Sequence, residues 1–187
     1  MSNALMSFVT RCYARPRQLF SCITFLSRQT SPDYEHVILV DEVGIGVEKA
    51  NGMFALPQNI ERVRGKYVYI IDSDDIVTYY NLVSEIKQIS EESDPDVIIV
   101  QCVHENGVPL PPDYDWLKYP VPAHVGSSSF VVRNEIWKEH IHLFGDSGVY
   151  HGDYIFACEL FEHDYKFHWL QKVVAHSLRQ NQGVINE

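Results

Sequence analysis

Three carboxylates follow an apolar run in the first half of the chain. The apolar residues 67–71 lead directly into Asp72, Ser73, Asp74 and Asp75. A run so rich in aromatic and β-branched residues predicts a buried strand of a mostly parallel sheet. Ligands of open α/β sheets bind beyond the carboxyl ends of such strands, and hard divalent cations prefer carboxylate oxygen. The cluster therefore predicts a Mg²⁺ or Mn²⁺ site. The alternative is an acidic turn in which Asp74 or Asp75 caps the next helix.

Strand and helix patterns alternate around this cluster. Helical spacing of apolar residues predicts helices over 17–28 and 79–92. Apolar runs predict strands over 6–10, 36–40, 67–72 and 97–103. Strands separated by helices indicate βαβ units, so the expected fold class is α/β with a mostly parallel central sheet flanked by helices.

The second half of the chain has a different character. Residues 106–123 hold five prolines, which exclude this segment from the middle of a sheet or helix and predict a long surface loop. Asn134 is expected to cap a helix that Gly145 stops. The remaining predicted elements are a strand over 128–133, a helix over 153–162 and two short closing strands over 167–170 and 172–175.

Composition excludes several classes of function. The 187 residues carry a formal net charge of −10, which argues against general nucleic-acid binding and against adhesion to an anionic membrane. No apolar stretch is long enough to span a bilayer, and no secretory signal opens the chain. The four cysteines form no C-x-x-C pair, and reduced thiols fit a cytoplasmic location. The length is that of a single domain.

Four segments of the first half, in this order, resemble motifs of one enzyme family. The stretch Ser7-Phe8-Val9-Thr10-Arg11-Cys12-Tyr13-Ala14-Arg15-Pro16 is similar to a family opening of the form P-T-Y-N-R-P. The next helix closes on Gln29-Thr30, and Val37-Ile38-Leu39-Val40-Asp41-Glu42 resembles a strand that ends V-D-D. Arg64-Gly65-Lys66-Tyr67 leading to Asp72-Ser73-Asp74-Asp75 resembles G-x-Y-x-x-x-L-D-S-D-D. The chain thus resembles a small, soluble family 2 glycosyltransferase of the GT-A fold, closely over residues 6–103 and loosely beyond.

This resemblance implies a fold and a function. It implies one GT-A-type domain over 1–187, with a Rossmann-like nucleotide-sugar-binding half at 5–103 and an acceptor-side half at 104–187. The implied enzyme is a hexosyltransferase-like protein that moves a sugar from a nucleotide-diphosphate donor, expected to be a UDP-sugar, to an acceptor hydroxyl with inversion. Mn²⁺ or Mg²⁺ is the implied cofactor. The acceptor could be a glycan, a lipid-linked molecule or a protein.

The resemblance also implies roles for residues of the donor half. Asp41 matches the carboxylate that recognises the nucleotide base, and a carboxylate can accept a hydrogen bond from a pyrimidine imide. Thr10 and Tyr13 match the wall beside the base and ribose. Asp72 and Asp74 match the family's D-x-D motif, in which Asp74 would coordinate the metal and Asp72 would bind ribose or a metal-bound water.

Two residues of the second half are candidates for the chemistry. In His151-Gly152-Asp153-Tyr154, Asp153 occupies the place of the family's catalytic base, although Gly152 stands where Glu is common. An acid in the first turn of a helix is also favoured by the helix dipole, so a purely structural role for Asp153 is the alternative. His176 falls where many GT-A enzymes place a late metal-binding histidine, and a partly exposed surface histidine is the alternative.

Other functions remain open at this point. A haloacid-dehalogenase-type phosphatase would use Asp72 as nucleophile with Asp74 and Asp146, but that motif normally opens its domain. A catalytically inactive nucleotide-sugar-binding module is the second alternative. No Q-x-x-R-W element and no membrane span are present, which by comparison with that family argues against a processive synthase. If Asp153 is not the base, the other candidates are Asp146, Glu159, Asp113 and Asp115.

Overall fold

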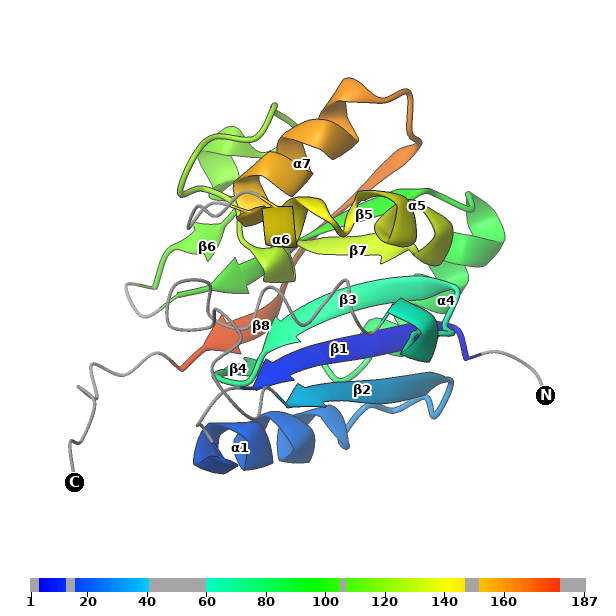
Figure 1. Ribbon diagram of the computed structural model, residues 1–187, viewed down its shortest axis with the longest axis vertical. Helices are drawn as coiled ribbons and strands as arrows, with labels where there is room; N and C mark the ends of the chain where they lie inside the picture. The colour runs from blue at the N-terminus through cyan, green and yellow to red at the C-terminus, as the bar shows by residue number, and fades with distance from the viewer. Residues whose placement is uncertain (1–3, 13–15, 41–59, 105–106, 147–151, 179–187) are drawn as a thin grey trace.

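The computed structural model describes residues 4–12, 16–40, 60–104, 107–146 and 152–178 (Figure 1). Eight strands form one sheet in the order β2-β1-β3-β7-β5-β8-β4, with β6 paired to β5. The strands are β1 (Met6–Cys12), β2 (Tyr34–Val40), β3 (Tyr67–Asp72), β4 (Asp75–Val77), β5 (Val97–Val103), β6 (Pro109–Leu110), β7 (Phe130–Arg133) and β8 (Phe167–Ser177). The α-helices are α1 (Pro16–Leu26), α4 (Leu82–Glu92), α5 (Asn134–His140), α6 (Leu143–Asp146) and α7 (Gly152–Glu162).

The sheet is of the predicted α/β type. Strand β1 pairs in parallel with both β2 and β3, and β5 pairs in parallel with β8. Strand β7 lies antiparallel between β3 and β5, so these two strands run in the same direction without touching along their length. The first-half prediction of parallel strands and crossover helices is therefore confirmed, while the position of β7 between them was not foreseen.

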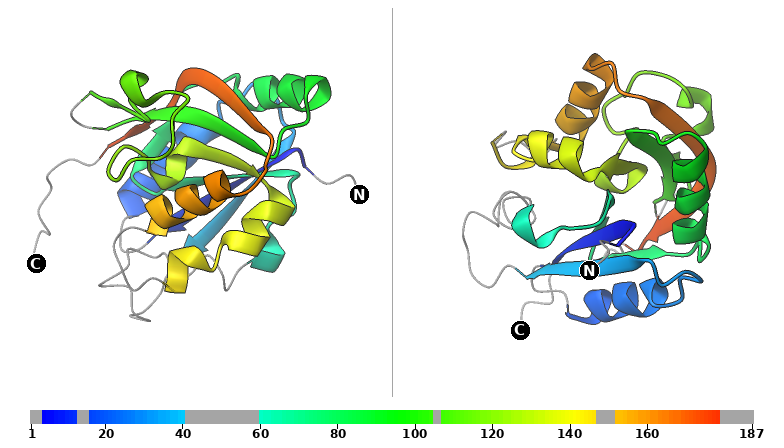
Figure 2. Two further views of the ribbon diagram at one scale, coloured as in Figure 1. Left: turned by 90° about the horizontal axis from the view of Figure 1, so that it is seen from above. Right: turned by 90° about the vertical axis from the view of Figure 1, so that its right-hand side faces the viewer.

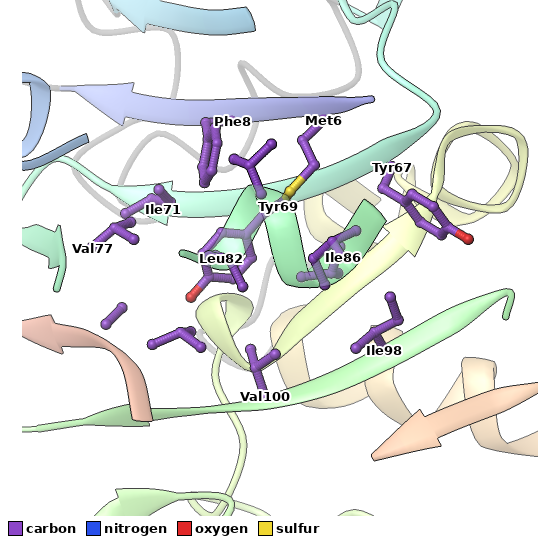
Figure 3. Packing of buried hydrophobic residues seen from close by; sticks show 14 of the residues in the cluster. Met6, Phe8, Tyr67, Tyr69, Ile71, Val77, Leu82, Ile86, Ile98 and Val100 are labelled. Atoms are coloured by element: carbon purple, nitrogen blue, oxygen red, sulfur yellow. The ribbon is translucent and has the colours of Figure 1, made fainter. Parts of the chain in front are cut away.

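Helices cover both faces of the sheet. Alternate residues of β3 point to opposite faces, because side chains alternate along a strand. Tyr67, Tyr69 and Ile71 pack with residues of α1 and α4, as Figure 3 shows for Tyr69, Leu82 and Ile86. On the other face, Val68 and Ile70 join a core that includes residues of α5, α6 and α7. Both cores are apolar and buried, and the hydrophobic effect is the main force that holds such layers together.

The curl of the sheet brings its last strand back to the acidic cluster. Strand β4 follows β3 after a two-residue turn, yet it pairs with β8 at the opposite end of the strand order. This connection is possible because the sheet is strongly curved, as Figure 2 shows. Asp75 lies opposite Ser177 in the β4–β8 pair, and the backbone N–H of Leu178 donates to the carbonyl of Asp74 at 2.7 Å.

Two local predictions for the second half were wrong. Asn134 does not cap α5 through its side chain. Its amide instead donates to the carbonyls of Val63 and Gly65 at 3.2 and 2.7 Å, and so ties the helix to the segment before β3. The two predicted closing strands form one strand, β8, whose register with β5 shifts between Ile99 and Cys102. A bulge of this kind interrupts the apolar alternation and so hides the continuity of a strand in the sequence.

None of the helices in the described ranges has both the length and the apolar character that crossing a bilayer would require.

Candidate active site

The acidic cluster lies at the end of β3, in the turn to β4. Asp72 is the last residue of β3, Ser73 and Asp74 form the turn, and Asp75 opens β4. Asp74 and Asp75 are each only 5% exposed, whereas the side chain of Asp72 is 24% exposed. The alternative in which Asp74 or Asp75 caps the next helix is wrong, since β4 intervenes and α4 begins at Leu82.

The cluster carries excess negative charge. Burial raises the pKa of Asp75 to about 8, and the nearby carboxylates of Asp72 and Asp74 add to that rise. A hydrogen bond with Ser177 acts in the opposite direction. Repulsion of this kind disfavours ionisation of all three acids together, and a bound cation would relieve it.

Arg11 neutralises part of this charge and was missed by the sequence reasoning. It stands opposite Asp72 in the β1–β3 pair, and its Nε donates to Asp72 Oδ1 at 2.7 Å. Its Nη2 forms an ion pair with the same oxygen and also donates to Ser127 Oγ at 3.3 Å. A signal was available, because an arginine in the otherwise largely apolar strand Met6–Cys12 must find a partner when it is buried.

The three predicted metal ligands lie in one region, but they do not form a complete site by themselves. Asp72 and Asp74 lie on either side of Ser73, and His176 stands opposite Ile76 in the β4–β8 pair, next to the Asp75–Ser177 pair. Within the described ranges, no three His, Cys, Asp or Glu side chains are arranged to hold an ion. Mg²⁺ commonly takes one or two carboxylates and completes its shell with substrate phosphates and water. The donor set fits an ion that is bound together with a diphosphate.

The structure describes only some of the predicted nucleotide-binding residues. Tyr13 and Asp41 lie outside the described residues. Thr10 is fully buried on β1, and its hydroxyl is 2.8 Å from His36 Nε2 and 3.7 Å from Cys22 Sγ. Burial lowers the pKa of His36 from 6.5 to about 4. The hydroxyl of Thr10 thus links β1 to His36 of β2 inside the protein. A direct contact between Thr10 and a nucleotide stays a prediction.

Asp153, the candidate base, comes from the second half of the chain. It lies in the first turn of α7, where its Oδ1 accepts the backbone N–H of Tyr154 at 2.9 Å. Burial raises the pKa of Asp153, the positive charge of Arg11 lowers it, and the negative charge of Asp72 raises it again. Asp153 is therefore within electrostatic range of both Arg11 and Asp72.

The glycine before Asp153 has a packing reason. A Cβ atom at Gly152 would lie 3.1 Å from the Cα of Phe144 and 3.4 Å from its carbonyl oxygen. The start of α7 lies close against the backbone of α6 at this point, so any side chain at position 152 would require the two backbones to separate by a few tenths of an ångström.

Three of the four other candidate bases have polar partners of their own. Glu159 lies within 4 Å of both His140 and His163, at 3.9 and 3.8 Å. Asp113 accepts a hydrogen bond from Gln101 at 2.9 Å. Asp115 pairs with His124 at the rim of a separate, mostly apolar crevice with about 260 Å³ of open space. The side chain of Asp146 lies outside the described residues.

Comparison with solved structures identifies the fold. The chain matches no protein-family model and no curated protein sequence. S. aureus TarS 1–349 in complex with UDP-GlcNAc superimposes with a TM-score of 0.69 at 13% identity, over 95% of this chain and 59% of that one. The mannosyltransferase PcManGT from Pyrobaculum calidifontis, in complex with GDP-Man and Mn²⁺, gives 0.66 at 16% identity, over 98% of this chain and 59% of that one. The apo form of the glycosyltransferase GlyE in Streptococcus pneumoniae TIGR4 superimposes with a TM-score of 0.52 at 17% identity, over 89% of this chain and 45% of that one.

The chain therefore has a GT-A-like glycosyltransferase fold, as the sequence resemblance implied. At these identities the likeness establishes the fold alone. This chain spans about six-tenths of TarS 1–349 and of PcManGT, and less than half of GlyE.

Proposed function

We propose that this chain is a metal-dependent glycosyltransferase that moves a sugar from a UDP-sugar to a hydroxyl group of an acceptor. One observation carries the proposal. Arg11 and Asp72 pair at the carboxyl ends of β1 and β3, and the charges of both act on the pKa of Asp153 in the first turn of α7. Ligands of α/β sheets bind at this edge, and TarS and PcManGT, which share the fold, were solved with UDP-GlcNAc and with GDP-Man and Mn²⁺.

The first half of the chain would hold the donor. Asp41 would accept a hydrogen bond from the uracil imide, with Thr10 and Tyr13 beside the base and ribose. Asp72 keeps a partly exposed carboxylate, which can accept hydrogen bonds from ribose hydroxyls. These assignments divide donor recognition between the strand ends of β1, β2 and β3.

The metal would be held by Asp74, with Asp72 or His176 near it and with the donor diphosphate completing its shell. An ion there would supply charge stabilisation for the departing diphosphate. Mn²⁺ and Mg²⁺ both suit carboxylate and phosphate oxygen. Burial is the largest cause of the raised pKa of Asp75, and the charges of Asp72 and Asp74 add to it, so a cation at this position would relieve part of the repulsion among the three acids.

Asp153 would act as the general base. It would take the proton of the acceptor hydroxyl while that oxygen bonds to the anomeric carbon and the bond from that carbon to the diphosphate oxygen breaks. The departing diphosphate keeps the electron pair. The rise in pKa that burial causes makes Asp153 a stronger base than an exposed aspartate, while Arg11 favours its ionised form. Attack opposite the leaving group would invert the anomeric centre.

The phosphatase alternative fits the structure poorly. The Oδ1 atom of Asp72 already accepts charge-assisted contacts from two nitrogens of Arg11, which reduces the nucleophilicity of that carboxylate. Two strands, β1 and β2, also precede it in the chain. The inactive binding module is distinguished from the enzyme only by experiment.

A ligand screen tests the proposal. UDP, UDP-GlcNAc and GDP-mannose are added with Mn²⁺ and again with chelator, while the melting temperature is followed and the Kd is measured by calorimetry. A ligand that binds only the folded state raises the apparent stability by mass action. We expect UDP and the UDP-sugar to bind in the presence of Mn²⁺. Chelator should raise their Kd by tenfold or more, and each factor of ten corresponds to about 1.4 kcal/mol of binding free energy.

Three other outcomes are informative. Equal binding with and without metal would remove the metal role from the acids. Binding without release of UDP from UDP-GlcNAc, across a panel of glycan, lipid-linked and peptide acceptors, would favour the inactive module. A covalent phosphate on Asp72 after incubation with a phosphate ester would establish the phosphatase.

A further inference from the structure

Arg11 is a buried positive charge that lies beside the acidic cluster without belonging to it. The residue is 4% exposed, and its contacts reach β3 and the short 3₁₀ turn Ser127–Ser129. Burying a guanidinium is unfavourable unless it is paired and hydrogen-bonded. The pairing here is incomplete, since Nη1 is buried without a hydrogen-bond partner in the part of the chain that the structure describes.

The contacts from Arg11 reach only one of the two carboxylate oxygens of Asp72. Both Nε and Nη2 of Arg11 approach the same oxygen, Oδ1. Two charge-assisted contacts from the planar guanidinium fork to one oxygen hold that oxygen in place and compensate part of the carboxylate's charge. Both of these contacts are to Oδ1, and the side chain of Asp72 remains 24% exposed. This arrangement suits a carboxylate that accepts hydrogen bonds from a ligand.

The residues around Arg11 are buried and hydrogen-bonded, and they come from both halves of the chain. Arg11 lies on β1 opposite Asp72 of β3, and Nη2 also contacts Ser127. The neighbouring carbonyl of Ser128 accepts a hydrogen bond from the buried hydroxyl of Tyr69 at 2.9 Å. Groups held in this way keep their geometry without reorganisation when a ligand binds.

We propose that Arg11 is a positioning residue for the transfer reaction, which acts by orienting Asp72 for contact with the nucleotide of the donor. This inference rests on the proposed function. It adds a residue outside the acidic cluster, and it assigns Asp72 to hydrogen bonding with the donor while Asp74 provides the stronger metal ligand. A purely structural ion pair between β1 and β3 is the competing explanation.

A double-mutant cycle separates these explanations. The variants are Arg11→Gln, Asp72→Asn and the double variant, and the measured quantity is the Kd for UDP at saturating Mn²⁺. Each single change is expected to weaken UDP binding by about tenfold, equal to about 1.4 kcal/mol. If Arg11 acts through Asp72, the double variant binds UDP within about twofold of Asp72→Asn, because the two losses do not add.

Control variants cover the effect on the fold. Arg133 forms a comparable ion pair with Asp96 at 3.0 Å, away from the acidic cluster, so Arg133→Gln should lower the melting temperature without changing the Kd for UDP. Arg11→Lys keeps a cation at the buried position and serves if Arg11→Gln does not fold. It should restore the melting temperature but only part of the affinity, because a lysine lacks the fork.

The outcomes are distinct. No UDP binding by the unaltered protein would overturn the proposed function itself. Unaltered UDP binding in both Arg11→Gln and Arg11→Lys would overturn the positioning role alone. Losses that multiply in the double variant would show that Arg11 acts independently of Asp72, and would overturn the inference in the same way.

Discussion

Gly152 lies against the backbone of Phe144, and this contact fixes the start of the helix that carries Asp153. The Cβ of any other residue at position 152 would lie 3.1 Å from the Cα of Phe144, closer than almost all contacts of this kind. Asp153 is the next residue, so its position relative to Arg11 and Asp72 depends on how closely α7 approaches α6. The missing side chain at position 152 is thus a condition for the placement of the proposed base.

The first prediction follows from this contact. Gly152→Glu would restore the acidic pair common in the family, but we expect it to lower turnover by at least tenfold, because α7 must shift away from Phe144. Gly152→Ala should show a smaller loss of the same kind. Release of UDP from UDP-GlcNAc measures both. Higher turnover in Gly152→Glu than in the unaltered protein would contradict the packing argument.

Asp153→Asn tests the base directly. The amide can still accept the N–H of Tyr154, so the helix start is preserved, but it cannot take a proton. Turnover is expected to fall by about 10²- to 10⁴-fold while the Kd for UDP changes little, since the base contacts only the acceptor hydroxyl. Glu159→Gln, on the same helix, is the matched control and should keep its turnover. A parallel loss of UDP affinity in Asp153→Asn would place Asp153 on the donor side instead.

Asp74→Asn tests the metal ligand. The substitution keeps the shape of a side chain that is 5% exposed and removes its negative charge. We expect the Mn²⁺-dependent part of UDP binding to fall by about tenfold or more, with only a modest change in melting temperature. Asp164→Asn removes an exposed acid elsewhere and should leave UDP binding unchanged. A protein that unfolds readily but still binds UDP through Mn²⁺ would show that Asp74 is structural.

Gly65→Ala is expected to destabilise the fold. A Cβ at this position would lie 2.5 Å from the backbone nitrogen of Ser7 and 2.6 Å from the carbonyl carbon of Met6, and neither backbone atom can move easily. The free energy of unfolding should fall by about 1–3 kcal/mol. Gly126→Ala is the control, because its Cβ meets nothing within 4 Å. Denaturant unfolding measures both variants, and equal stability of the two would refute the clash.

His36 makes the stability depend on pH. The pKa of His36 is about 4 in the folded protein, against an ordinary value of 6.5, so between these values the unfolded chain binds more protons. The contribution of neutral His36 to the free energy of unfolding is therefore fully present above about pH 6.5, and it is lost as the pH falls toward 4. In His36→Gln, the fall in the free energy of unfolding between about pH 6.5 and pH 4 should be smaller by roughly 1–3 kcal/mol. This range allows for partial solvent screening of the imidazole.

The measurement is the free energy of unfolding as a function of pH. His142→Gln, at an exposed position, is the control and should follow the curve of the unaltered protein. If His36→Gln follows that curve as well, burial does not keep the imidazole of His36 neutral in the folded protein.

The sequence by itself determined the elements whose patterns are local. The spacing of Leu82, Val83, Ile86 and Ile89 predicted the buried face of α4, and the apolar run before Asp72 predicted β3. Periodicity reports which face of an element is buried, and this information is contained within a few residues. The acids at the end of β3 could be recognised as a candidate site for the same reason.

Only the tertiary structure decided which distant residues meet. Strand β7 enters between β3 and β5, and the curl of the sheet pairs β8 with β4, because sheet order follows from long-range packing rather than from local pattern. Asn134 bonds to Val63 and Gly65 instead of capping its own helix for a similar reason. Arg11 pairs with Asp72 because β1 and β3, which are distant in the sequence, lie side by side in the sheet. Their charges act on the pKa of Asp153, which comes from still later in the chain, and no local sequence pattern predicts this. The candidate site therefore combines acids visible in the sequence with Arg11, whose pairing with Asp72 the fold creates.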